Sequence, residues 1–212
     1  MMHRSLPCRV RCAHRLYILN LFVTPMPNFR RSILPGGTFF FTVVAEQRAR
    51  ILCGEHARKI LGETLRECRV QWSFQIDAFV LLPDHLHALW TLPAGDADYS
   101  KRWAWIKKEF SKSWLSIGGS EQEVGSSRTR RRRRGVWQRG FWEHTIKDEK
   151  DYARHFDYIH WNPVKHGLVE AVCDWPFSTF HRWVRQGVYS RGWGGRGTEP
   201  LDFSDLDDSA ME

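Results

Sequence analysis

Hydrophobic and polar residues follow regular patterns from residue 38 onwards. Residues 38–45 form an aromatic and β-branched run after a Pro-Gly-Gly turn at residues 35–37, which is typical of a β-strand. Residues 73–82 and 85–92 predict two further strands, and the Pro-Asp turn at residues 83–84 predicts that they pair as a hairpin. The first half of the chain is therefore expected to supply a central sheet.

Two helices are predicted from apolar residues that recur at intervals of three and four. Residues 55–69 carry one apolar face, which is expected to pack on the sheet. Residues 99–114 show the same spacing and carry Lys101, Lys108 and Lys112 on their other faces. The second helix is therefore predicted to be basic and amphipathic.

A third helix begins near Asp148 and is expected to end close to Pro163, because proline cannot continue an α-helix. At about 100° per residue, Tyr152 falls on an apolar stripe that is expected to face the core. Tyr158 and Asn162 fall together on a separate, polar face. Tyr152 is therefore interpreted as structural, and Tyr158 as a candidate for chemistry.

These elements divide the 212 residues into one domain with two terminal segments. Residues 26–183 hold the predicted elements, and a chain of this length buries one core rather than two. Residues 1–25 are expected to be a disordered extension or the product of a mis-assigned start codon. Residues 184–212 form a tail that is acidic at its end. Within the domain, residues 117–135 are rich in Gly, Ser and Arg and predict a mobile loop rather than an element.

Positive charge is concentrated in the body of the chain. Lys and Arg total 32 against 24 Asp and Glu, and six of the acids lie in the last fourteen residues, which contain no base. The remaining 198 residues therefore carry 32 basic against 18 acidic side chains, a balance of +14. Such a balance favours a polyanionic partner, because phosphate neutralisation is the main sequence-independent source of nucleic-acid affinity. Solubility alone is the alternative.

The cysteines and the N-terminus indicate the compartment. The five cysteines include no CxxC pair, which argues against a disulfide framework and a zinc ribbon and fits a reducing cytoplasm. The apolar stretch at residues 16–23 is too short to span a membrane and lacks a signal-peptide cleavage site. No membrane association is expected.

Two histidines stand two residues apart on the predicted strand 85–92. His85 and His87 therefore project from one face and Leu86 from the other, so the two imidazoles can share a cation. A lone His-x-His pair is common by chance, and ordinary histidines on a half-exposed strand are the better explanation of the pair taken alone. Tyr158 taken alone could be a surface tyrosine of an amphipathic helix.

Several collinear motifs decide between these readings. A His-hydrophobe-His motif, a later helical tyrosine and a polar residue four positions on resemble the single-tyrosine HUH transposases of the insertion-sequence 200 type. The likeness is strongest to their domesticated relatives, which are associated with repetitive extragenic palindromes (REPs). Two departures are the length of the Arg-rich insertion before Trp137 and the N-terminal 25 residues. The resemblance spans about residues 28–183, and its segments are 36–43, 82–87, 90–93, 137–144, 157–169 and 174–179.

The resemblance implies an α+β fold in which a central antiparallel sheet of ferredoxin-like type is flanked by helices. It also implies that His85, His87 and Asn162 hold a divalent metal, Mg²⁺ or Mn²⁺, and that Tyr158 attacks a backbone phosphate. The chemistry is consistent, because a neutral tyrosine hydroxyl is a poor nucleophile and needs a cation that polarises the phosphate. By ligand softness, two imidazoles and an amide suit Mn²⁺ better than Mg²⁺.

The expected activity is that of a metal-dependent single-strand DNA endonuclease and strand transferase acting on hairpin or palindromic DNA. Its 5′-phosphotyrosine intermediate conserves the energy of the cleaved bond, so a free 3′ hydroxyl can rejoin strands without ATP. The candidate phosphate contacts are Lys101, Lys108, Lys112 and Arg139, with a solvated charged face as the alternative. The arginines at 130–134 could clamp DNA non-specifically. A monomer is expected, although a dimer that shares its sites is possible.

Two other functions remain open. A domesticated protein could bind hairpins without cutting them, and a phosphodiesterase could use water in place of Tyr158, leaving no covalent adduct. The acidic residues within 199–212 could compete with DNA for the basic surface. Trp142 and Trp175, which have apolar neighbours, are interpreted as core residues rather than stacking platforms.

Overall fold

The computed structural model describes residues 32–195 together with Asp202, Phe203 and Leu206. The expected extension at residues 1–25 and most of the acidic end of the chain lie outside the described residues. The elements in chain order are β1 (Thr38–Val44), η1 (Glu46–Arg48), α1 (Glu55–Gln71), β2 (Gln75–Leu81), β3 (His85–Thr91), α2 (Tyr99–Ser116), α3 (Ser126–Arg130), β4 (Trp142–Thr145), α4 (Glu149–Lys165), η2 (Val172–Asp174) and α5 (Phe180–Arg185).

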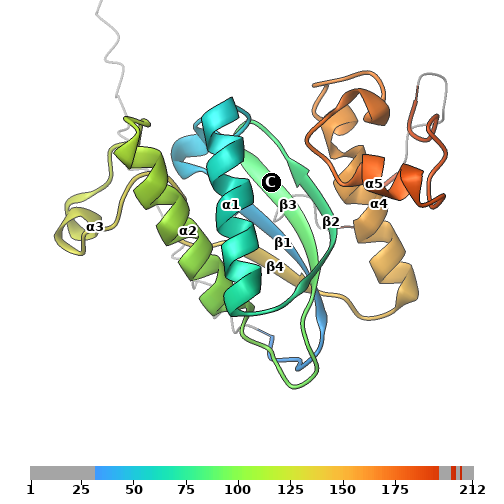
Figure 1. The fold of residues 1–212 in the computed structure, drawn as a ribbon, viewed down its shortest axis with the longest axis horizontal. Coiled ribbons are helices and arrows are strands. Elements are labelled where there is room, and N and C mark those ends of the chain that lie inside the picture. Colours follow the sequence, from blue (N-terminus) through green and yellow to red (C-terminus); the bar gives the residue numbers. More distant parts are fainter. Residues whose placement is uncertain (1–31, 196–201, 204–205, 207–212) are drawn as a thin grey trace, which may run out of the picture. The chain divides into compact units, whose positions relative to one another are not determined.

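The four strands form one antiparallel sheet in the order β2-β3-β1-β4 (Figure 1). β1 and β2 are joined through α1, and β3 lies between them. This is the split β-α-β connection of ferredoxin-like folds. The predicted α+β fold with a central antiparallel sheet and flanking helices is confirmed.

Both faces of the sheet are covered, and each has its own core. Phe41 of β1 and Trp90 of β3 belong to the core under α1 and α2. Their neighbours on the opposite face, such as Phe40 and Leu89, belong to the core under α4 and α5, because successive side chains of a strand point to opposite faces. Figure 1 shows α1 and α2 on one side of the sheet and α4 and α5 on the other. None of the described helices has the length and apolar character needed to cross a membrane.

The core beneath α2 is mainly aromatic. The indole of Trp103 on α2 has no exposed surface and stacks on that of Trp90, with ring centroids 4.1 Å apart and planes at 14°. Phe41 meets both indoles edge-on. Because large aromatic side chains dominate the energetics of a core, the position of α2 on the sheet depends on this group.

The helix α4 begins at an N-cap and continues through a proline. The carboxylate of Asp148 accepts a hydrogen bond from the amide of Asp151 at 2.8 Å, which satisfies one of the free N–H groups of the first turn. The helix runs to Lys165, two residues beyond Pro163. Proline is tolerated here because it removes a single hydrogen bond and only the last turn follows it. The helix therefore ends close to Pro163, as predicted.

Residues 117–135 contain an element that the sequence analysis did not predict. The short helix α3 lies within them, so the prediction of a loop without an element is wrong. Arg128 of α3 donates to Glu46 at 2.7 Å, and the amide of Gln122 donates to the carbonyl of Gly135 at 2.8 Å. The sequence lacked a helical period here because contacts with distant residues, rather than an apolar stripe, hold this helix.

The packed region also continues past the expected boundary at residue 183. Tyr189 is 8% exposed and belongs to the core under α4 and α5. Its hydroxyl donates to Asp157 of α4 at 2.5 Å and lies 3.1 Å from Nδ1 of His160. Residues just after α5 therefore help to hold α4 in place.

The substitution Trp103→Ala is expected to lower the free energy of unfolding by about 3–5 kcal/mol, because it removes a buried ring and leaves a cavity. Urea denaturation followed by circular dichroism measures this change. Val70→Ala on α1, where Val70 is 87% exposed, serves as the control and should change the free energy by less than about 0.5 kcal/mol. Equal effects of the two substitutions would contradict the packing described.

Candidate functional site

The strand β3 presents two histidines to the face of the sheet that α4 covers. The register pairs His87 with Thr42 and His85 with Val44, and the histidines are 0% and 2% exposed. Their ring centroids are 4.9 Å apart. The two side chains therefore share one face, as the two-residue spacing on a strand predicts.

His85 is oriented by the residue before it. Its Nδ1 lies 2.8 Å from a carboxylate oxygen of Asp84. Burial alone would raise the pKa of Asp84, but the hydrogen bonds and charges of His85 and Arg48 lower it to about 2. An ionised carboxylate only accepts hydrogen bonds, so Nδ1 of His85 carries the proton. The imidazole with a carboxylate behind it is an arrangement common to metal-binding histidines.

His87 is oriented by the neighbouring strand. Its Nδ1 lies 2.9 Å from the hydroxyl of Thr42 on β1. Burial lowers the pKa of His87 well below its usual range, and the nearby charges of Lys165 and Arg48 lower it to a smaller extent. The ring is therefore neutral. Donation from Nδ1 to the Thr42 hydroxyl would leave the lone pair on Nε2.

Four buried polar atoms at these residues have no hydrogen-bond partner within the described part of the chain. They are Nε2 of His85, Nε2 of His87 and both amide atoms of Asn162. Each such atom costs about 1–3 kcal/mol when left unpaired, so a concentration of them calls for a bound ligand. Imidazole nitrogens and an amide oxygen are ligands for divalent metals such as Mn²⁺. These residues therefore fit a divalent metal.

Tyr158 lies on α4 one turn before Asn162 and faces His87. Its ring centroid is 5.5 Å from that of His87, and its side chain has no exposed surface. The ammonium of Lys165 donates to the Tyr158 hydroxyl at 3.3 Å and lies 5.0 Å from the ring centroid. A cation thus contacts the oxygen that would bear negative charge as a nucleophile or leaving group.

A residue near the C-terminus covers Tyr158. The ring of Phe203 meets that of Tyr158 at a centroid distance of 5.5 Å and an angle of 82°. Arg154 on α4 lies over the Phe203 ring at 5.1 Å and donates to the carbonyl of Asp202 at 2.6 Å. Because Tyr158 has no exposed surface in this arrangement, a phosphate can reach its hydroxyl only after a covering group such as Phe203 has moved.

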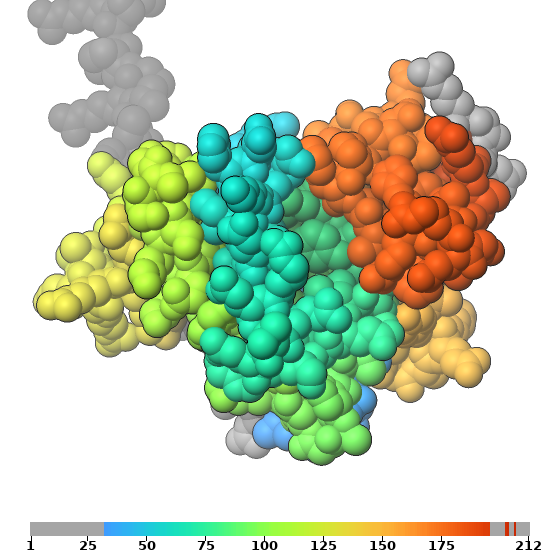
Figure 2. Space-filling model, in the orientation of Figure 1, coloured from blue at the N-terminus to red at the C-terminus, as the bar shows by residue number. Residues whose placement is uncertain are grey.

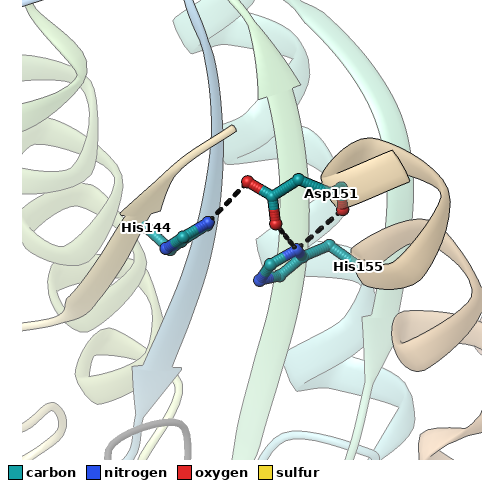
Figure 3. A group of neighbouring side chains, drawn as sticks. All are labelled: His144, Asp151 and His155. Carbon is teal, nitrogen blue, oxygen red and sulfur yellow. Dashed lines mark hydrogen bonds and ion pairs between the residues drawn. The ribbon is translucent and has the colours of Figure 1, made fainter. Parts of the chain in front are cut away.

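A second group, His144, Asp151 and His155, also consists of side chains that could hold a metal (Figure 3). It joins β4 to α4. Asp151 lies 2.8 Å from Nε2 of His144 and 3.0 Å from Nδ1 of His155. Helix periodicity places Asp151 and His155 on the polar face of Tyr158 and Asn162, but the sequence does not predict the group, because His144 comes from a strand that was not predicted.

The geometry of this second group favours a hydrogen-bonded clamp over a metal site. The imidazoles of His144 and His155 stack with centroids 4.5 Å apart and planes at 14°. Nitrogen lone pairs lie in the plane of the ring, so nearly parallel stacked rings do not direct theirs at one ion. The nitrogens facing Asp151 already have oxygen partners. His85, His87 and Asn162 have buried atoms that lack such partners within the described residues.

A basic groove of about 900 Å³ lies between α2 and residues 128–141. Three of the four predicted phosphate contacts, Lys108, Lys112 and Arg139, line it. Lys101 does not line it, and its ammonium lies over the ring of Trp72 at 4.2 Å. Arg132, Arg133 and Arg134, which belong to the arginine run predicted to clamp DNA, also line the groove. The basic residues of the groove that were not predicted are Lys107 and Arg128.

Two aromatic residues of the matched motifs have the structural role expected of them. Trp142 and Trp175 are half-buried and pack against the core under α4 and α5. The indole N–H of Trp175 donates to the carbonyl of Leu81 at 3.0 Å. Tyr152 is also half-buried, and its ring stacks on that of Phe156 at 5.8 Å. Tyr152 therefore has the structural role expected of it, whereas Tyr158, expected on a separate polar face, is fully buried in the same core.

Known proteins resemble this chain along most of its length. Residues 38–162 match the model of the IS200-like transposase family. A REP-associated tyrosine transposase of Escherichia coli K12 is 42% identical over 180 residues, which cover 84% of this chain and 96% of that protein. A relative in Haemophilus influenzae, named for the same family, is 40% identical over 170 residues, which cover 80% of this chain and 94% of the relative.

A solved structure agrees with these matches. The structure of a REP-associated tyrosine transposase bound to a REP hairpin has a TM-score of 0.67 and 41% sequence identity, and the match covers 82% of this chain and 95% of that one. The family match spans β1, β3 and α4 as far as Asn162, which are the elements that build the site. The chain therefore belongs to the IS200-like transposase family, among the REP-associated tyrosine transposases.

Proposed function

We propose that this chain is a metal-dependent single-strand DNA endonuclease and strand transferase that acts on hairpin or palindromic DNA through a 5′-phosphotyrosine at Tyr158. One observation carries the proposal: the unpartnered buried atoms of His85, His87 and Asn162 stand on the face of the sheet and helix that also holds Tyr158. A structural role alone does not explain why these atoms are buried without partners.

The reaction exchanges one phosphoester for another. The hydroxyl oxygen of Tyr158 forms a bond to phosphorus, its proton passes to solvent, and the P–O3′ bond breaks with its electron pair on O3′, which takes a proton from water. His85, His87 and Asn162 would hold Mg²⁺ or Mn²⁺, which polarises the scissile phosphate when bound. In the reverse step a free 3′ hydroxyl displaces the tyrosine, so cleavage and rejoining use the same residues.

Neighbouring residues orient this machinery. Asp84 is hydrogen-bonded to Nδ1 of His85, and Thr42 is hydrogen-bonded to Nδ1 of His87. These bonds would leave Nε2 of each ring for the proposed metal. Lys165 contacts the hydroxyl of Tyr158 and would stabilise negative charge on that oxygen in both directions of the reaction. The clamp of His144, Asp151 and His155 would fix the N-terminal half of α4 against the sheet.

The proposed partner is single-stranded or hairpin DNA. The solved relative is bound to a REP hairpin, and Lys108, Lys112 and Arg139 line a groove suited to phosphates. Lys101 would contribute from outside that groove. The proposed working state is a monomer, because one chain already places the ring centroids of His87 and Tyr158 5.5 Å apart. The proposed compartment is the cytoplasm.

A second candidate function is hairpin binding without cleavage. The observation that favours it is the complete burial of Tyr158 beside Phe203. If this cover never opened, the chain could still bind DNA through its basic groove. A covalent adduct between protein and DNA separates the two functions, because only cleavage forms one.

The substitution Tyr158→Phe is expected to abolish the covalent adduct with hairpin DNA, because it removes the attacking oxygen and little else. The assay incubates the protein with labelled single-stranded hairpin DNA and Mn²⁺ and resolves the adduct on a denaturing gel. Tyr152→Phe on the same helix is the matched control and should still form the adduct. An adduct with Tyr158→Phe would show that another residue is the nucleophile.

The substitutions His87→Ala and Asn162→Ala are each expected to lower metal affinity at least about tenfold, because each removes one proposed ligand. Titration calorimetry with Mn²⁺ measures this, and adduct formation should stop when EDTA removes the metal. His144→Ala removes a residue of the clamp and should leave Mn²⁺ affinity within about twofold of the unmodified chain. A loss of Mn²⁺ affinity in His144→Ala but not in His87→Ala would show that the metal binds at the clamp and not at the proposed ligands.

The substitution Lys165→Met is expected to slow adduct formation about 10- to 100-fold, because it removes the cation beside the reacting oxygen and keeps a side chain of similar length. Single-turnover kinetics at saturating DNA measure the rate. Lys165→Arg restores the charge and should recover part of it. If Lys165→Met and Lys165→Arg are equally slow although both bind DNA normally, charge is not the property that matters.

A further inference from the structure

The basic groove has two walls that come from different parts of the chain. Lys108 and Lys112 of α2 stand on one wall, and Arg132 and Arg133, just after α3, contribute to the other. In Figure 2 the segment that contains α3, in yellow, projects beyond α2, in lime. The second wall therefore belongs to the Arg-rich segment within residues 117–135.

Some basic residues of the groove are engaged in holding its walls. Arg128 pairs with Glu46, and Arg134 pairs with Glu121. The ammonium of Lys107 donates to two backbone carbonyls of residues 138–140. These contacts fix the shape of the groove, and the other basic residues that line it take no part in them.

The basic residues of the groove outnumber the acidic residues near them. None of the sixteen described residues that line the groove is acidic. Lys108 and Lys112, whose side chains are 75% and 78% exposed, share Glu109 on their own helix, and Arg132 and Arg133 also line a neighbouring pocket that contains Glu121 and Glu123. Arg132, Arg133 and Arg139 are exposed. Like charges gathered in this way repel one another, and a polyanion in the groove would relieve that repulsion.

The groove adjoins the end of the sheet that carries the candidate metal ligands. The amide of Gln138, which lines the groove, donates to the carbonyl of Val44 at 3.0 Å. Val44 is the residue of β1 that pairs with His85. A nucleic-acid strand that left the groove at Gln138 would therefore reach the end of β1 that pairs with His85.

We propose that this groove binds the backbone of a single DNA strand flanking the hairpin, with the Arg-rich segment 128–134 as its second wall. This inference rests on the proposed function and names the part of the substrate that the groove holds. A single DNA strand can lie between facing walls and contact basic side chains on both sides. A duplex is convex and its two backbones are separated by grooves about 6–12 Å wide, so it would meet only the rim.

The test compares two double substitutions that remove the same charge. Arg132→Gln with Arg133→Gln changes residues that line the groove, whereas Arg130→Gln with Arg131→Gln changes exposed neighbours that do not line it. Both pairs are made in the Tyr158→Phe background and studied in EDTA, so that binding is measured without cleavage. Lys108→Gln with Lys112→Gln provides an independent pair from the opposite wall.

Fluorescence anisotropy measures binding of a hairpin with a single-stranded flank, the same hairpin with blunt ends, and the flank alone, at several salt concentrations. Loss of Arg132 and Arg133 is expected to weaken binding of both flank-bearing probes about fivefold or more at low salt. The slope of the logarithm of the binding constant against the logarithm of salt concentration should fall in magnitude by about 1.4, because each phosphate contact on a single strand contributes about 0.7. The blunt hairpin and the control pair should change less than about twofold.

Three results would overturn the inference. Equal weakening of the blunt hairpin would place the duplex stem in the groove. Equal effects of the two arginine pairs would show that only overall charge matters. Flank binding unchanged by either groove pair would show that the groove holds no DNA. None of these results depends on adduct formation, so failure of the cleavage proposal and failure of this one can be told apart.

Discussion

The antiparallel register between β1 and β3 is the constraint on which the candidate site depends. It pairs Thr42 with His87 and Val44 with His85, which places both imidazoles under α4. A slip of one residue would turn them into the aromatic core beneath α2, where Trp90 now stacks on Trp103. The site and the core on the opposite face are therefore specified together, and neither can form in a different register.

Elements with a clear hydrophobic period could be predicted from the sequence. β1, β2, β3, α1 and α2 lie within about two residues of their predicted bounds, because their apolar faces are repeated locally. β4 and α3 could not be predicted. β4 has four residues and is defined by its pairing with β1, and α3 is held by the contact of Arg128 with Glu46, 82 positions away. Interactions this distant leave no local signal.

The candidate site shows the same division. Strand and helix periodicity placed His85 with His87 and separated Tyr158 from Tyr152, and the family resemblance supplied the link between strand and helix. The burial of Tyr158, its contact with Lys165 and its cover by Phe203 depend on how distant segments pack. The proposed nucleophile is buried in this way, so movement of Phe203 would precede the proposed chemistry.

The central claim is that His85, His87 and Asn162, rather than the clamp of His144, Asp151 and His155, hold the metal beside Tyr158. Anomalous X-ray diffraction from crystals soaked with Mn²⁺ tests it most directly. A peak is expected at coordination distance from Nε2 of His85, Nε2 of His87 and Oδ1 of Asn162. A peak between His144 and His155, with none at His85 and His87, would contradict the claim.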